Sequence, residues 1–209
     1  YNLQKVLSTV LVSDQVTDVL TLIGSEKPDI SILSDGFLQE ISNMPQKNLA
    51  LDLLNRLLNN QVSSKFRSNL VQKRVFSELL QKSINKYSNR SIEAAEVIKE
   101  LIQIANKFKE ESLKLDSLNL TTPEIAFYDA ISNNKSVKEL MSETVLVNMA
   151  REIAEKIRNN LSIDWQHKEN VRAKLRLIVK SLLKKYKYPP DQEKNTIELV
   201  IKQAELLSV

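Results

Sequence analysis

The apolar residues of this chain recur at the spacing of an α-helix along almost its whole length. Amphipathic segments of about ten to twenty residues are separated by short polar breaks, and no alternating run is long enough to indicate a strand. In the segment after Pro45, for example, Leu49, Leu53, Leu57 and Val62 fall on one stripe. The pattern predicts an all-α protein, an irregular bundle of about nine helices with no significant sheet.

Several polar residues indicate where helices begin. Ser34 can cap a short helix, and Pro45 suits the first turn of the helix that follows. Thr122 followed by Pro123 predicts a capped helix start, and residues 136–139 have the sequence of a capping box. Further helices are expected at about 3–23, 66–87, 88–118, 145–161 and 168–186, with a last one after Pro190.

The length of 209 residues allows one large domain or two small ones. We expect a single helical domain over residues 1–209, with 1–62 and 66–209 as candidate sub-bundles on either side of the polar run Ser63-Ser64-Lys65. The chain begins without Met and inside a helical pattern, so we expect it to be part of a longer polypeptide.

Glycine is scarce in this chain, and cysteine is absent. There are two glycines, Gly24 and Gly36, where average usage of about 7% would give roughly fifteen. Because phosphate loops and dinucleotide fingerprints need glycine, we expect neither, and without cysteine there is no disulfide or thiolate zinc site. We therefore expect no cofactor and no metal in this chain, no membrane span, and a reducing, cytoplasmic location.

The positive charge is concentrated in one segment. Residues 151–190 hold eleven Lys and Arg against four Asp and Glu, a net +7 that leaves −3 for the rest of the chain. Within the helix expected at 168–186, one apolar arc should face the core, formed by Val171, Leu175, Ile178, Val179, Leu182 and Tyr186. Four basic residues recur every fourth position on the opposite side: Arg172, Arg176, Lys180 and Lys184.

That basic stripe is the candidate partner-binding surface. It could dock an acidic protein surface or follow the phosphates of DNA, and a solvated helix face is the alternative interpretation, since no aromatic residues are interleaved for base stacking.

Other polar residues are better explained by structure than by catalysis. His167, the only histidine, could act as a general base oriented by Asp164 or Glu169, but a capping Asp164 beside an anchoring Trp165 is the favoured interpretation. Asp129 lies among apolar residues and must find hydrogen bonds or a cation, which the basic helix could supply. The predicted core includes Trp165, Tyr128, Leu175, Ile178 and Leu182.

Several stretches of the sequence together carry a further signal: residues 163–165, 169–176, 179–180 and 182–191, Tyr87-Ser88-Asn89-Arg90 with 92–95, 126–130, and 26–34. Together they resemble the C-terminal domain of the restriction, or motor, subunit of type I restriction-modification enzymes. The family pattern has Thr where Ser162 stands and Gly where Lys187 stands.

The resemblance implies a parent subunit with a nuclease domain and two ATPase domains that translocate DNA with ATP and Mg. The helical C-terminal region would attach this motor to a methyltransferase core of modification and specificity subunits, with DNA present in the holoenzyme. The chain itself is then expected to be a non-catalytic assembly module, and a DNA-contacting module that uses the basic helix 168–187 is the alternative. Structural roles are expected for Asn89, Arg90, Tyr128, Asp129, Asp164 and Trp165.

Overall fold

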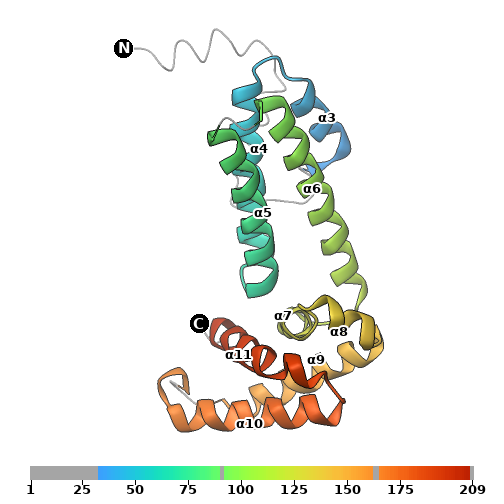
Figure 1. Ribbon diagram of the computed structural model, residues 1–209, viewed down its shortest axis with the longest axis vertical. Helices are drawn as coiled ribbons and strands as arrows, with labels where there is room; N and C mark the ends of the chain where they lie inside the picture. Colours follow the sequence, from blue (N-terminus) through green and yellow to red (C-terminus); the bar gives the residue numbers. More distant parts are fainter. Residues whose placement is uncertain (1–32, 90–91, 162–164, 208–209) are drawn as a thin grey trace. The chain divides into compact units, whose positions relative to one another are not determined.

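The computed structural model describes residues 33–89, 92–161 and 165–207 (Figure 1). Within these ranges the chain forms nine α-helices, one short 3-10 helix and no strand, which confirms the predicted all-α fold. The helix expected at 3–23, and the residues Arg90 and Asp164, lie outside the described residues.

The helices follow one another with short connections. They are α3 (Asp35–Asn43), α4 (Lys47–Lys65), α5 (Leu70–Ser88), α6 (Ala94–Ser117), α7 (Thr122–Ile131), α8 (Lys135–Leu140), α9 (Glu143–Arg158), the 3-10 helix η2 (Trp165–His167), α10 (Glu169–Lys185) and α11 (Pro190–Leu207).

The described residues form two compact units. The first contains residues 33–64 and 80–109, and the second contains 65–79 and 110–207, so that α5 and α6 each contribute to both. Helix α4 continues through the polar run Ser63-Ser64 and ends at Lys65. The assignment of the whole chain to a single domain stays a prediction.

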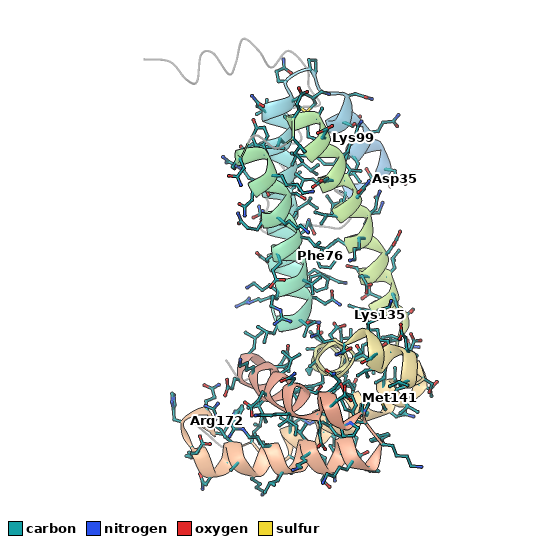
Figure 2. All side chains as sticks on the ribbon, viewed as in Figure 1. Asp35, Phe76, Lys99, Lys135, Met141 and Arg172 are labelled. Atoms are coloured by element: carbon teal, nitrogen blue, oxygen red, sulfur yellow. The ribbon has the colours of Figure 1, made fainter. Side chains whose placement is uncertain are left out.

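The first unit has a core of aliphatic side chains and a polar surface. Fully buried leucines on α4 and buried residues on α6 fill its interior. The predicted cap is confirmed, because the Ser34 hydroxyl accepts a hydrogen bond from the backbone N–H of Phe37. At the surface, Lys109 of α6 lies 2.7 Å from the carboxylate of Asp35, which is labelled in Figure 2. The core residues of the first unit include Leu38, Ile41, Leu54, Leu58, Leu80, Val97, Ile98, Leu101 and Phe108.

Helix α7 is the central element of the second unit. Its last six residues, 126–131, are all buried, and it packs against α9 and α11 (Figure 1). Helix α10 packs against α9, α11 and η2, where Trp165 is only 3% exposed. In the same unit Phe66 and Phe76 stack with their ring centroids 5.5 Å apart.

Two of the predicted helix caps differ from those in the structure. The carboxylate of Glu124 accepts hydrogen bonds from the backbone N–H and the hydroxyl of Thr121, so the cap of α7 lies one residue before Thr122. The predicted capping box at 136–139 is wrong, because Asn134 caps α8 by accepting a hydrogen bond from the N–H of Ser136. Asparagine is as good a cap as serine, and Ser136 already lies in the first turn.

Helix α10 ends in a left-handed residue that is not glycine. Lys187 has φ 55°, its N–H donates to the carbonyl of Lys184 at 3.0 Å, and the N–H of Tyr188 donates to the carbonyl of Leu183 at 2.9 Å. These two bonds form a Schellman motif, in which glycine is the usual left-handed residue. The turn brings Tyr188 into the core, where its hydroxyl donates to the carbonyl of Ile131.

Candidate functional site

The inner side of α10 holds the helix in the second unit. Of the predicted apolar arc, Leu175, Val179 and Leu182 are buried, and Leu183 is buried beside them. The other three members of the arc are only half-buried: Val171, Ile178 and Tyr186. Burial of Trp165, Tyr128, Leu175 and Leu182 is therefore confirmed, and the prediction that Ile178 belongs to the core is wrong. Ile178 lies at the edge of the arc, and Leu183 is buried although it was not assigned to the arc.

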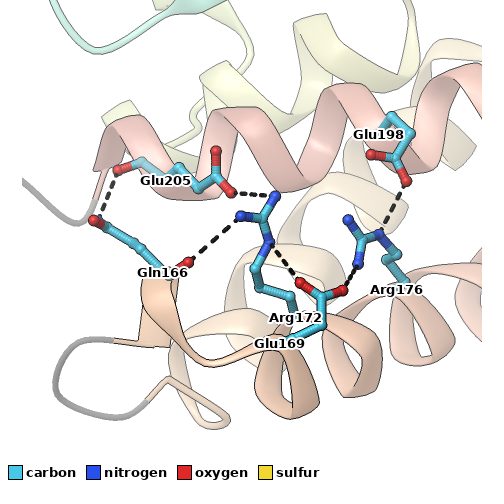
Figure 3. Close-up of polar contacts among 6 residues, drawn as sticks. All are labelled: Gln166, Glu169, Arg172, Arg176, Glu198 and Glu205. Atoms are coloured by element: carbon cyan, nitrogen blue, oxygen red, sulfur yellow. Dashed lines mark hydrogen bonds and ion pairs between the residues drawn. The ribbon is translucent and has the colours of Figure 1, made fainter.

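Arg172 joins three segments at the beginning of α10 (Figure 3). Its Nη2 lies 3.0 Å from the Oε1 of Glu205 on α11, an ion pair whose alignment falls short of a hydrogen bond. Its Nε lies 4.0 Å from the carboxylate of Glu169, and its Nη1 donates to the carbonyl of Gln166 at 3.4 Å. The side chain of Gln166 in turn donates to the carbonyl of Glu205 at 3.3 Å.

Arg176 makes a second bridge one turn further along (Figure 3). Its Nε donates to Glu198 of α11, and its Nη1 donates to Glu169, each at 3.0 Å. These hydrogen bonds, first to Glu198 and then to Glu169, raise the pKa of the Arg176 guanidinium. Both arginines are thus engaged in attaching α10 to α11, and the four predicted basic residues do not form one free surface.

Lys180 and Lys184 lie on the open side of α10. Both are exposed, and neither forms an ion pair within the part of the chain that the structure describes. Lys174 and Leu177 are exposed beside them, with Leu177 68% accessible. At 100° per residue the four side chains project within an arc of about 120°. We call these four residues the lysine face.

Two members of the lysine face, Lys174 and Leu177, were not among the partner-binding residues predicted from the sequence. A signal was present for Leu177, because it is offset by about 160° from Leu175 around the helix and therefore lies outside the apolar arc. A single exposed leucine is common on protein surfaces, so only its position between unpaired lysines distinguishes it.

The buried carboxylate of Asp129 lies elsewhere in the second unit. Its Oδ2 accepts a hydrogen bond from Nδ2 of Asn69 at 2.6 Å, and its Oδ1 accepts one from Nε2 of Gln72 at 3.0 Å. The prediction that the basic helix supplies a cation to Asp129 is wrong, since Asn69 and Gln72 bind the carboxylate and Arg172 pairs with Glu205. Burial raises the pKa of Asp129, although its two amide donors act in the opposite direction.

Two other candidate residues, His167 and Asn89, lie at the surface of the described part of the chain. His167 is exposed, and Glu169, which was considered as its orienting group, binds Arg176. Asn89 lies exposed in the turn after α5, where its N–H donates to the carbonyl of Asn85. Among the described residues, no group of three or more His, Cys, Asp and Glu side chains could hold a metal ion. None of the helices described there combines the length and apolar character needed to cross a membrane.

Two cavities lie within the described residues of the second unit. The first, of about 230 Å³, lies between α7, α9 and the end of α11 and is lined by Phe127, Ile157 and Leu207, with Arg151 and Arg158 among its other residues. The second, of about 360 Å³, is polar, and its lining includes four amide side chains: Asn133, Asn134, Gln192 and Asn195. Neither lies on the lysine face.

Comparison with known proteins identifies similar sequences over the whole chain. A family model described as "Type I restriction enzyme HindI endonuclease subunit-like, C-terminal" matches residues 1–209. The type I restriction enzyme HindI endonuclease subunit of Haemophilus influenzae is 40% identical over 203 residues, which cover 97% of this chain and 19% of that protein. A protein of Methanocaldococcus jannaschii with the provisional name type I restriction enzyme MjaIXP endonuclease subunit is 31% identical over 185 residues, which cover 88% of this chain and 18% of that protein. No solved structure matches significantly.

Proposed function

The chain belongs to the family of C-terminal regions of type I restriction enzyme endonuclease subunits, and from that membership we propose that it is a non-catalytic assembly module. It spans about a fifth of the length of the curated relatives that it matches. In the proposed role it docks the remaining parts of a longer subunit, an ATP-dependent DNA translocase and endonuclease, onto a methyltransferase core of modification and specificity subunits.

The lysine face of α10 is the observation that most directly supports docking. Its lysines carry charge that no acidic side chain of the described residues neutralises by an ion pair, while the arginines of the same helix are paired with α11. Unpaired charge on a rigid helix is a surface suited to electrostatic steering and orientation of a partner.

The catalytic steps are assigned to parts of the longer subunit outside this chain. ATP and Mg would be bound there, because this sequence has neither a phosphate loop nor a metal-ligand cluster in its described residues. The complete enzyme would act on DNA in the cytoplasm.

A direct contact with DNA is the second candidate function. Lys174, Lys180 and Lys184 on one side of a helix could follow phosphates, and such binding would weaken steeply with salt for any DNA sequence. The absence of aromatic side chains from this face disfavours single-stranded DNA, whose binding depends on base stacking.

The test uses the full-length subunit that carries this chain. Its capture by the purified methyltransferase core should be lost when residues 1–209 are removed, while the truncated subunit retains ATPase activity on DNA. Equal capture of the truncated and complete subunits would refute the assembly role. Loss of the ATPase activity together with capture would instead place a catalytic part within the deleted region.

A further inference from the structure

We propose that the lysine face binds an acidic protein surface that contains an apolar recess, and that Leu177 inserts into this recess. The inference rests on the proposed assembly function and specifies the contact and its chemistry. Compared with the predicted basic stripe, the proposed contact surface keeps Lys180 and Lys184. It omits Arg172 and Arg176, which pair with α11, and it adds Lys174 and Leu177.

Charge is the first reason for an acidic partner. Every exposed residue of α10 from 173 to 184 is basic or uncharged, and they comprise Ala173, Lys174, Leu177, Lys180, Ser181 and Lys184. Acidic groups facing this side would pair with cations that have no ion pair within the described ranges. A second copy of the chain is disfavoured, because a symmetric contact would bring like charges together.

The exposed side chain of Leu177 favours a protein partner over DNA. Its side chain is 68% exposed, and lysines flank it on both sides along the helix. Interfaces gain most from apolar anchors that are buried at their centre and surrounded by a polar rim. A leucine that faces DNA phosphates has no comparable recess to enter, so DNA binding would depend on the lysines alone.

The two ends of α10 are held in place, which makes its exposed side a preorganised surface. At the beginning, Arg172 and Arg176 connect it to α11. At the end, the carboxylate of Glu152 on α9 accepts hydrogen bonds from Lys185 at 2.7 Å and from the hydroxyl of Tyr186 at 2.8 Å. A surface that is already ordered loses little conformational entropy on binding.

The experiment compares variants of the full-length subunit in binding to the methyltransferase core and, separately, to a DNA duplex without a recognition site. One variant carries Leu177→Ala, and another carries Lys174→Glu, Lys180→Glu and Lys184→Glu together. The apolar control is Leu113→Ala, since Leu113 on α6 is 69% exposed. The charge control is Lys73→Glu, Lys99→Glu and Lys107→Glu, at three exposed lysines of α5 and α6 (Lys99 is labelled in Figure 2).

We expect Leu177→Ala to weaken binding to the core by about tenfold and the lysine triple variant by at least as much. The two controls should bind as the unaltered subunit does, and all variants should keep the same helical circular dichroism. Affinity of Leu177→Ala for the duplex should remain unchanged.

Three results would overturn the inference. If the unaltered subunit binds the core and both lysine-face variants bind it equally well, docking uses another surface and only the proposed assembly function survives. If the lysine variant loses duplex binding while Leu177→Ala leaves core binding intact, the face contacts DNA. If the unaltered subunit fails to bind the core, the assembly function itself is refuted, and the proposed contact with it.

Discussion

The carboxylate of Asp129 on α7 and the amide of Asn69, in the turn before α5, are joined by a buried hydrogen bond of 2.6 Å. The Asn69 amide oxygen accepts from the N–H of Gln72, which fixes the amide nitrogen as the donor to Asp129. Nearby, the fully buried Gln203 of α11 donates to the carbonyl of Ser68 and accepts from the N–H of Leu70. Polar side chains of α7 and α11 thus form hydrogen bonds that stabilise the turn between α4 and α5 within the second unit.

Replacement of Asp129 by Ala should destabilise the 209-residue chain by about 2 to 4 kcal/mol. The substitution leaves the buried amide groups of Asn69 and Gln72 without their acceptor, and each unsatisfied buried donor costs about 1 to 3 kcal/mol. Asp129→Asn keeps one acceptor oxygen and should cost less. Urea denaturation followed by circular dichroism measures both, and equal midpoints for Asp129→Ala and the unaltered chain would contradict the role of this pair.

The same carboxyl group should make stability depend on pH. Because burial raises the pKa of Asp129, the folded state holds its proton more tightly than the unfolded state does. Its contribution to stability is therefore fully present below the unfolded pKa and is lost as pH rises through the folded pKa. The free energy of unfolding of the unaltered chain, relative to Asp129→Asn, should decrease as pH is raised from below about 3.9 toward neutrality. A difference that increases with pH would show that the amide donors outweigh burial.

Arg176 and Lys180 should respond differently to reversal of charge, although both belong to the predicted basic stripe. Arg176→Glu removes two hydrogen bonds and places a third carboxylate beside Glu169 and Glu198, so it should cost about 1 to 2 kcal/mol, a value moderated by partial exposure. Lys180→Glu changes an exposed residue and should alter stability by no more than about 0.5 kcal/mol. Thermal unfolding of the two variants tests this, and equal melting temperatures would mean that the bridges to α11 contribute nothing.

Local sequence signals predicted the helices and much of the core, because helical periodicity depends only on neighbouring residues. Ser34 as a cap and Trp165 as a buried anchor follow from such signals. Such signals could not identify Asn69 as the partner of Asp129 or Glu205 as the partner of Arg172. These pairs are separated by about 60 and 33 residues in the sequence, and they form only because of how the helices pack. The division of the basic helix into paired arginines and a lysine face has the same origin, because the positions of α9 and α11 decide which cations of α10 form ion pairs within the described residues.

The left-handed conformation of Lys187 gives a prediction about the turn that ends α10. Its φ of 55° places a residue with a Cβ in the left-handed region, which costs about 1 to 2 kcal/mol relative to glycine. Glycine would remove this strain. It would also increase the conformational entropy of the unfolded chain, which destabilises the folded state by about 0.4 to 1 kcal/mol and cancels part of the gain. The net expectation is that Lys187→Gly stabilises the chain by about 0.5 to 1 kcal/mol. Lys184→Gly, at an exposed position inside the last turn of α10, is the matched control and should destabilise by about 1 kcal/mol. If both substitutions lower the urea midpoint alike, the turn after α10 does not hold Lys187 in the left-handed conformation.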